Sequence, residues 1–376
     1  METTNKQRHL ATTNNEENMN EQYQSGKSKK STGGGTEKIS LISVICCIAV
    51  VYMHLGWFHG VQPQLTTNWI LSLIIEKVFV FAVPVFFMIS GTTLLNYTDR
   101  YDDITFFKKR IKKVVIPWIA WSFISFLYCF IFNRDEIGSL NLLDIFDGII
   151  NNKYRSIYWF FPVLISVYLC IPLFANIDKN RRRVFEYLVL AGLIFNIVLP
   201  DFGKILNINM PIGVPVVAEY LIYVLIGWLI FYNQEQYQRL YPVIYFAGLS
   251  ALLIQLIGTT ILSLSIGVES RVFRDCNTLN FLYSISIWSV CVNYGDFFLK
   301  NKIVRKIVDM LKAYTLPIYL IHQFANNLVQ KVFEFCGVIV EGTILYQLFG
   351  PILVIMISVL VARILRKIPY LRRIVP

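Results

Sequence analysis

ISLISVICCIAVVYMHLGW, Ile39–Trp57, is an apolar run long enough to cross a bilayer, and one imidazole, that of His54, lies within it. An imidazole removed from water must be solvated by partners, so polar side chains in membrane spans usually face a bundle interior or a watery cavity. At roughly 100° per residue, one helix face is small or polar: Ser43, Cys46, Cys47, Val50 and His54. A lone histidine on an apolar helix is more often a hydrogen-bonded packing residue than a catalyst. We keep both interpretations and take His54 as the candidate reactive centre.

Composition places the chain among polytopic membrane proteins. Of its 376 residues, 55% are hydrophobic and only 16% are charged, which is too apolar for a soluble domain. Residues 1–38 differ, because they are polar, low in complexity and unable to bury a core. We therefore expect a disordered cytoplasmic tail at 1–38 and a transmembrane domain at 39–376. No cleavable signal precedes the first apolar run, which is expected to act as an uncleaved anchor.

The apolar runs predict an all-α bundle of about ten transmembrane helices. Runs of roughly 17 to 25 residues fall at about 39–57, 70–96, 114–132, 157–176, 184–200, 212–232, 241–263, 278–298, 313–333 and 343–364. The connections on one side of these spans carry 27 lysines and arginines, and those on the other side carry 6. The positive-inside rule then places both termini in the cytoplasm. The net charge of +11 thus reflects topology, and no nucleic-acid partner is expected.

Three further patterns narrow the prediction. The outer connection Asn133–Ser156 contains LNLLDIFDGII, which indicates a re-entrant or interfacial helix. The seven cysteines are odd in number and have no CxxC spacing, and the four histidines form no ligand-spaced cluster with carboxylates, so no disulfide framework or metal site is expected. No internal repeat suggests inverted symmetry, which weakens a secondary-transporter interpretation.

Sequence motifs around the second and third spans point to a family. The second span ends in VPVFFMISG, Val83–Gly91, and the basic stretch FFKKRIKKVVIP, Phe106–Pro117, follows it. Together with His54, this VPxFFxxSG ending and the R-x-x-[RK]-x-x-x-P pattern resemble the membrane acyltransferase type 3 family. These are multi-pass O-acyltransferases that modify bacterial surface glycans. The basic pattern falls here on Arg110, Lys113 and Pro117.

Other motifs match the same family in the right order. YWFFPVLISVYLCIPLF (158–174) is similar to its WF…Y…P span, YLIYVLIGWL (220–229) to its Y…G span, and LPIYLIHQF (316–324) to its IYLIH segment. The ending KIPYLRRIVP looks like the tail of many members, so the resemblance covers roughly residues 39 to 376.

Two positions depart from the family pattern. Members usually carry an arginine eleven residues before the first-span histidine, about 16 Å away on nearly the same helix face. Ser43 occupies that position, and Ile157 replaces a histidine often found two residues before the tryptophan of the WF motif. The arginine is implied to hold the donor or the reaction intermediate. Either Lys38, Arg110 or Lys113 supplies that charge instead, or the chain represents a divergent subgroup.

The chemistry that the resemblance implies is acyl transfer from a thioester to a sugar hydroxyl. This needs a base with a near-neutral pKa close to the hydroxyl proton, and His54 fits. The donor, acetyl-CoA or another acyl-CoA, is anionic and cytoplasmic, so the cluster Lys108–Lys113 is a natural landing site for its phosphates. Topology and anionic lipid also demand basic residues at the inner ends of spans, and this explanation stays open.

The other candidate residues each have a structural alternative. Ser90, with Gly91, forms either a close-packing pair, which we favour, or a binding turn. His322 either pairs with His54 or bonds a neighbouring carbonyl, and Glu219 is a candidate acceptor-hydroxyl ligand or histidine partner. Trp159 and Tyr168 are either sugar-stacking platforms or, as we favour, packing or interface aromatics. Glu76 and Lys77, early in the second span, are expected at the outer interface.

We therefore expect a membrane O-acyltransferase of the bacterial cytoplasmic membrane that acetylates or acylates a cell-surface polysaccharide or its lipid-linked precursor. Its partners would be acyl-CoA, the glycan and the bilayer, no permanently bound cofactor is expected, and homo-oligomerisation is left open. The alternative from another class is an export or transport protein of the same fold, which moves a polysaccharide, an acyl group or a small amino acid. A sensor ranks last, because no soluble effector domain is attached.

Overall fold

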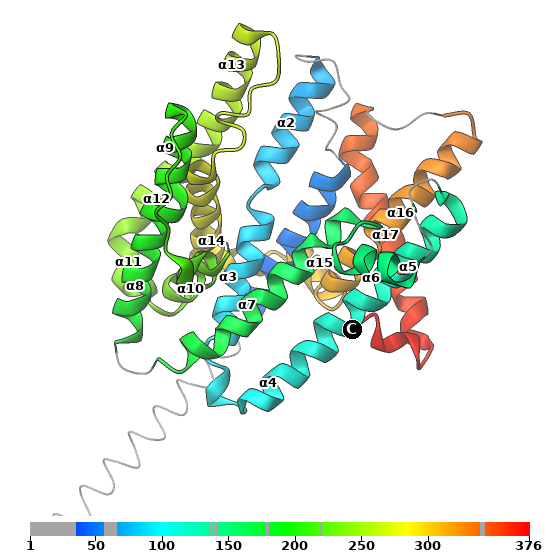
Figure 1. Ribbon diagram of the computed structural model, residues 1–376, viewed down its shortest axis with the longest axis horizontal. Coiled ribbons are helices and arrows are strands. Elements are labelled where there is room, and N and C mark those ends of the chain that lie inside the picture. Colours follow the sequence, from blue (N-terminus) through cyan, green and yellow to red (C-terminus); the bar gives the residue numbers. More distant parts are fainter. Residues whose placement is uncertain are drawn as a thin grey trace, which may run out of the picture.

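The computed structural model describes residues 35–55, 66–134, 137, 141–177, 180–218, 220–338 and 343–376. Within these residues the regular structure is all helical, without a strand, as the sequence predicts (Figure 1). The first helix is Gly35–Leu55. The next elements are α2 (Thr67–Phe79), α3 (Ala82–Leu94), α4 (Asp103–Arg110), the π-helical turn η2 (Ile111–Val115), α5 (Ile116–Phe132), α6 (Leu142–Ile150), the 3-10 turn η4 (Ser156–Trp159) and α7 (Phe160–Ala175).

The second half continues in the same way. It comprises α8 (Arg181–Gly192), η5 (Leu193–Val198), α9 (Leu199–Leu206), α10 (Leu221–Tyr232), α11 (Gln234–Tyr237), α12 (Tyr241–Leu253), η8 (Ile254–Gly258), α13 (Thr259–Ile266), α14 (Asn277–Lys300), α15 (Lys302–Leu311), α16 (Thr315–Phe335) and α17 (Ile344–Lys367).

Seven helical runs in the described part are long and apolar enough to cross a membrane: Gly35–Leu55, Thr67–Asp99, Asp103–Phe132, Ser156–Ala175, Arg181–Leu206, Gln234–Ile266 and Ile344–Lys367. The other three predicted spans are also helical, but α10 has only 12 residues. In α14 and α16, asparagine, glutamine and serine side chains lower the hydropathy. The chain is thus a helical membrane protein, whereas ten crossings and two cytoplasmic termini stay predictions.

The start of the sixth predicted span, at residue 212, is wrong. Helix α10 begins only at Leu221, and a mostly irregular segment precedes it, with a single 3-10 turn at Pro215–Val217. Pro211 and Pro215 have no backbone N–H to donate, so they cannot serve as donors in a continuous helix. Hydropathy alone does not register this interruption, because the irregular residues are themselves apolar.

The Gly35–Leu55 helix runs through the centre of the bundle. Ile42 on one side is 1% exposed and belongs to the main core, while Val51 is fully buried in a second core that includes residues of α16 and α17. Cys47 Sγ lies 3.5 Å from the carbonyl oxygen of Thr315, and Tyr52 Oη donates to Leu348 O at 3.0 Å. A helix that is apolar on every face is expected to be buried. The central position of this helix brings His54 next to α16.

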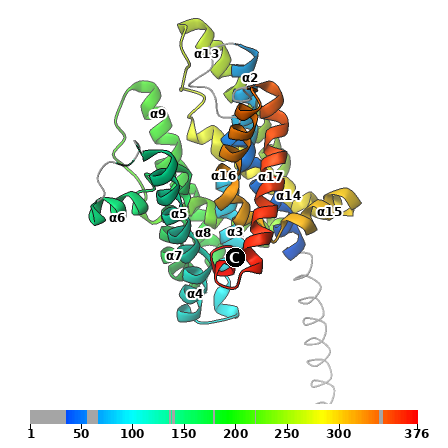
Figure 2. The same ribbon diagram turned by 90° about the vertical axis from the view of Figure 1, so that its right-hand side faces the viewer.

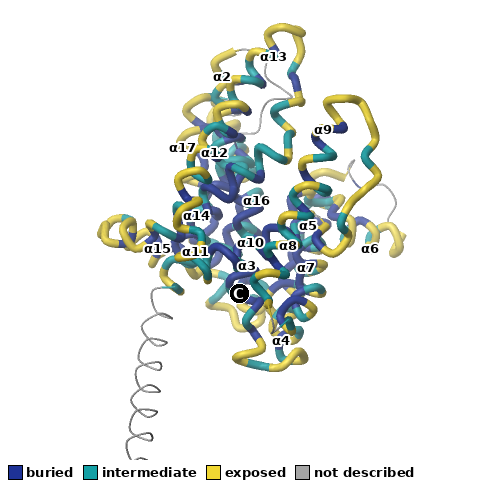
Figure 3. Tube along the Cα trace, turned by 90° about the vertical axis from the view of Figure 1, so that its left-hand side faces the viewer, coloured by how far each residue is buried: buried dark blue, intermediate teal, exposed yellow. Residues whose placement is uncertain are grey.

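Helices α3 and α10 are close neighbours in the buried centre of the bundle (Figure 3). A Cβ added at Gly91 would lie 1.9 Å from Val224 O, and one at Gly227 would lie 2.4 Å from Met88 Cα. Thr92 Oγ1 bridges the same crossing by donating to Gly227 O at 3.2 Å. Small residues let membrane helices approach this closely, so Gly91 of the SG pair is a packing residue.

The two ends of the bundle differ. Helix α4 and the C-terminal segment lie at one end, which we call the basic end, and α9, α13 and the start of α2 lie at the other (Figure 1). The helix expected within Asn133–Ser156 is present as α6, which projects sideways from the bundle (Figure 2). Its apolar residues face outward, with Leu142 79% and Phe146 62% exposed. This pattern is typical of a helix that lies at a membrane interface.

Candidate active site

His54 and His322 form a hydrogen-bonded pair inside the bundle. His54 lies one residue before the end of the first helix, and His322 lies in the first half of α16. Nδ1 of His54 is 2.9 Å from Nε2 of His322, and the two rings stack at 5.0 Å with an angle of 13° between their planes. His322 is fully buried and His54 half-buried. The fold thus joins two histidines that are 268 residues apart.

Two backbone carbonyl groups determine which ring nitrogens of this pair carry a hydrogen. Nδ1 of His322 is 2.8 Å from Tyr319 O and 3.2 Å from Ile318 O. A carbonyl oxygen can only accept, so Nδ1 of His322 carries the hydrogen, and with neutral rings its Nε2 must accept from His54 Nδ1–H. Nε2 of His54 then keeps its lone pair, and it makes no hydrogen bond to any residue in the described part. A nitrogen in this state can take a proton from a substrate hydroxyl.

The 3-10 turn η4, just before α7, is hydrogen-bonded to the part of α16 that carries His322. The hydroxyl of Tyr158 donates to Leu320 O at 2.8 Å, and the hydroxyl of Tyr319 donates in the opposite direction to Ile157 O. The ring of Tyr319 also packs 5.9 Å from that of His322. Because Tyr158 is fully buried, these two hydrogen bonds lie inside the protein. They fix the position of η4 relative to His322.

Arg155, which the sequence analysis missed, contacts the residue that directly follows His322. Nη1 of Arg155 donates to Gln323 Oε1 at 3.4 Å, and the guanidinium lies 4.3 Å from the ring centroid of Phe324 and 5.4 Å from that of Tyr128. Gln323, which accepts this hydrogen bond, directly follows His322 in α16. In the sequence Arg155 counts only as one charge in an outer connection. The one local indication that Arg155 has a role is that it directly precedes the residues SIYWFF, which contain the WF motif.

A second cluster lies toward the basic end, around Tyr168. The guanidinium of Arg110 lies 5.6 Å from the Tyr168 ring, and the Tyr168 hydroxyl is near both Arg110 and Ser90. Ser90 Oγ donates to Phe86 O at 3.1 Å. Lys113, in contrast, is exposed. The structure therefore brings Arg110 and Ser90 together and leaves Lys113 on the surface.

Lys113 lies within the π-helical turn Ile111–Val115, which begins directly after Arg110. Pro117 has no N–H to bond to the carbonyl of Lys113, and its ring would clash with that carbonyl in a regular α-helix. The wider turn, which follows Arg110 directly, relieves this conflict. Turns of this kind are frequent at functional sites. Nε of Arg110 is buried and has no hydrogen-bond partner among the described residues.

Phe160 connects the two clusters. Its ring lies 5.6 Å from that of Tyr319, which packs on His322, and 6.1 Å from that of Phe86, whose carbonyl holds Ser90. Phe160 thus contacts one residue that borders the histidine pair and one that borders the Arg110 cluster.

The remaining candidates lie elsewhere. Trp159 is 40% exposed and packs against Tyr220 at 6.0 Å, and Glu219 lies outside the described residues. Lys77, expected at the interface, is 1% exposed, because Glu76 at 2.7 Å and the carbonyl of Arg274 at 2.7 Å partner its ammonium group inside the protein. A buried charge of this kind is tolerated only when it is paired.

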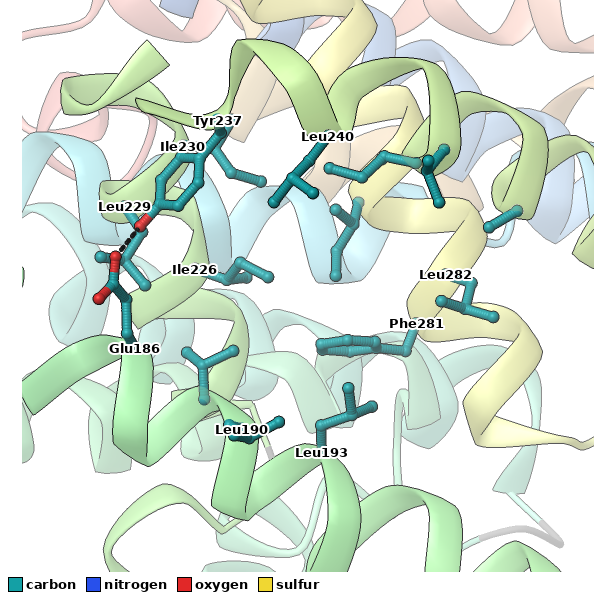
Figure 4. Close-up of a pocket in the computed structure, with 15 residues that line it drawn as sticks. Glu186, Leu190, Leu193, Ile226, Leu229, Ile230, Tyr237, Leu240, Phe281 and Leu282 are labelled. Carbon is teal, nitrogen blue, oxygen red and sulfur yellow. Dashed lines mark hydrogen bonds between the residues drawn. The ribbon is translucent and has the colours of Figure 1, made fainter. Parts of the chain in front are cut away.

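An apolar cavity of about 360 Å³ lies apart from both clusters (Figure 4). Its walls come from α8, α10, α12 and α14, and a hydrogen bond from the Tyr237 hydroxyl to Glu186 at 2.7 Å lies at its edge. None of the candidate residues lines this cavity. The described residues also contain no group of three or more side chains that could hold a metal ion.

Comparison with known proteins identifies one match. A family model of acyltransferase type 3, described as an acyltransferase domain, matches residues 37–363. No curated protein and no solved structure matches the chain.

Proposed function

The chain belongs to the acyltransferase type 3 family of membrane proteins, and from this premise we propose that it moves a short acyl group, such as acetyl, from acyl-CoA to a glycan hydroxyl. The acceptor is a cell-surface polysaccharide or its lipid-linked precursor, and the protein works in the bacterial cytoplasmic membrane. The observation that carries this proposal is the His54–His322 pair, in which one imidazole nitrogen has a lone pair and no partner among the described residues.

In the proposed reaction His54 is the general base. Nε2 of His54 takes the proton of the acceptor hydroxyl while the hydroxyl oxygen forms a bond to the thioester carbonyl carbon. The carbon–sulfur bond then breaks, and the thiolate of CoA leaves with the proton that His54 has held. His322 orients His54 and shares the charge of the imidazolium, because its own proton is anchored on two backbone carbonyls.

Arg110 supports the donor side of the reaction. Its guanidinium has one buried nitrogen without a partner among the described residues and lies next to Ser90 and Tyr168. Planar guanidinium groups bind phosphate oxygens in pairs. We assign the phosphates of CoA to this cluster and the acyl carbonyl to the histidine pair, with Phe160 between them.

The test is the O-acyl content of surface polysaccharide, measured by NMR before and after mild base. The cells carry the wild-type chain, a deletion, His54→Ala or His9→Ala, each checked for membrane abundance, and His9 in the N-terminal tail is the matched histidine control. Acylation is expected to vanish in the deletion and in His54→Ala and to persist in His9→Ala. Full acylation in His54→Ala would contradict the proposal. A deletion that lowers only the amount of surface glycan would indicate the export alternative.

A further inference from the structure

Arg155 has an open hydrogen-bonding edge. Its Nε and Nη2 are both buried, and neither has a hydrogen-bond partner in the described part of the chain. The other nitrogen, Nη1, is held by Gln323, and the plane of the group lies against the ring of Phe324 at 4.3 Å. Nε and Nη2 are the two donors on one side of a guanidinium that together hold an anion. One side of Arg155 is thus fixed, and the side suited to an anion is free.

An unpaired guanidinium edge is costly inside a protein. Burying a charged donor without an acceptor is among the largest penalties that a folded chain carries, so such groups are normally paired. No carboxylate of the described residues lies within ion-pair distance of Arg155, whereas Arg274, Lys77 and Lys38 each have one. Among the described residues no carboxylate completes this edge, and an anion that binds during function could do so.

Arg155 lies beside the part of α16 that carries His322. Gln323, which holds it, directly follows His322, and His54 Nε2 is the other polar group of this site without a partner in the described part. When the acceptor hydroxyl adds to the thioester, the carbonyl oxygen gains the negative charge, one bond length from the atom that is attacked. A cation placed at this point stabilises the transition state more than the neutral thioester.

We propose that the Nε–Nη2 edge of Arg155 binds the carbonyl oxygen of the acyl group as it becomes an oxyanion. This assignment rests on the proposed acyl transfer and adds a catalytic residue to it. The bond changes are those given above. The oxygen–carbon bond forms, the carbonyl π electrons move to the oxygen facing Arg155, and they return when the carbon–sulfur bond breaks.

The test uses the full-length protein in liposomes, with labelled acetyl-CoA and base-treated surface polysaccharide from the same cells as acceptor. Arg155→Gln is expected to lower kcat about 100- to 1,000-fold, the effect of losing one oxyanion donor, with KM for both substrates within about twofold. Arg134→Gln is the matched control, because Arg134 lies in the same connection and over an aromatic ring, that of Phe130, but is exposed. It should retain the wild-type rate.

A second variant separates chemistry from folding. Arg155→Ala leaves space for a free guanidinium ion, so adding guanidinium at millimolar concentration should restore part of kcat in Arg155→Ala and none in His54→Ala. An unchanged kcat in Arg155→Gln overturns the assignment. A raised KM for the polysaccharide at unchanged kcat also overturns it, because Arg155 would then bind an anionic acceptor. No restoration of kcat in Arg155→Ala likewise counts against it.

The failure of this inference differs from failure of the proposed function. If the wild type transfers acetyl and His54→Ala does not, while Arg155→Gln remains active, only the Arg155 assignment falls. If wild-type liposomes transfer no more acetyl than protein-free liposomes, the proposed function falls, and the Arg155 assignment falls with it.

Discussion

The histidine pair and the Arg110 cluster are built in different ways. The first joins three segments that are far apart in the chain, at His54, at Arg155–Tyr158 and at Tyr319–Gln323. Two hydrogen bonds between side chains and one to a backbone carbonyl connect them. The second gathers on neighbouring helices around Tyr168, and its cation comes from a local run of basic residues. The pair thus lies inside the bundle, with His322 fully buried and His54 half-buried. The Arg110 cluster lies beside exposed residues such as Lys113 and is suited to a substrate that arrives and leaves.

The largest effect is expected at the pair itself. His322→Ala removes the acceptor that fixes the proton of His54 on Nδ1, so His54 loses its orientation as a base. We expect acetyl transfer to fall about 10²- to 10⁴-fold, the usual range for general-base catalysis. Initial rates in liposomes at matched protein content measure this loss. A rate within threefold of wild type would show that His322 serves only to pack α16.

The next effect concerns the scaffold shared by both regions. Gly91→Ala places a Cβ 1.9 Å from the Val224 carbonyl oxygen, and this is a backbone atom that cannot move aside. Overpacking of this kind typically costs about 1–3 kcal/mol. Thermal unfolding in detergent should show a lower midpoint than for Gly35→Ala. In that control the new Cβ meets only the Phe231 ring at 3.4 Å. Equal midpoints would mean that α3 and α10 are not held at this close distance.

A smaller effect separates Arg110 from Lys113. Arg110→Gln removes a partly buried cation, and a hydrogen bond to a charged group contributes about 1.5–3 kcal/mol, which corresponds to about 10- to 100-fold in affinity. We expect KM for acetyl-CoA to rise by this factor, whereas Lys113→Gln, on the exposed side of the π-helical turn, should change it less than threefold. Equal effects of both variants would indicate that the cluster acts only through its total charge.

The smallest effect lies outside both regions, in α6. Hydrogen bonds from Lys153 and Asn151 lower the pKa of Asp147 below its ordinary value. A carboxyl group with a lowered folded-state pKa stabilises the fold above its unfolded pKa of about 3.9, and this contribution is lost as the pH falls through the folded pKa. The protection factors of the amides at the end of α6, measured by hydrogen exchange, should fall between about pH 5 and pH 3. Asp147→Asn should remove this dependence, and its persistence would assign it to another group.

Much of the fold and some of the site could be predicted from the sequence. Apolar runs predicted the helical membrane bundle, and the motifs gave His54, His322, Arg110 and the family. Hydropathy could not predict where α10 begins, because the preceding irregular segment is just as apolar. Arg155 was missed for a different reason. Its neighbours are set by side chain to backbone bonds that cross 162 residues, and nothing local in the sequence encodes those.

The contrast between local motifs and long-range contacts also applies to Ser43. The family resemblance expects a positive charge at that position on the first helix, and the chain has a half-buried serine there. The sequence offers Lys38, Arg110 and Lys113 as replacements. Arg155, which none of the motifs includes, is the cation that contacts the residue next to His322.

The measurement that most directly tests the central claim is a double-variant cycle on the histidine pair. Acetyl transfer is measured for the wild type, His54→Ala, His322→Ala and the double variant in the same liposomes. If the two imidazoles act as one base, the double variant should be no slower than His54→Ala alone, because residues that act as a unit are not additive. Multiplicative losses, or a His54→Ala protein with the wild-type rate, would contradict the account.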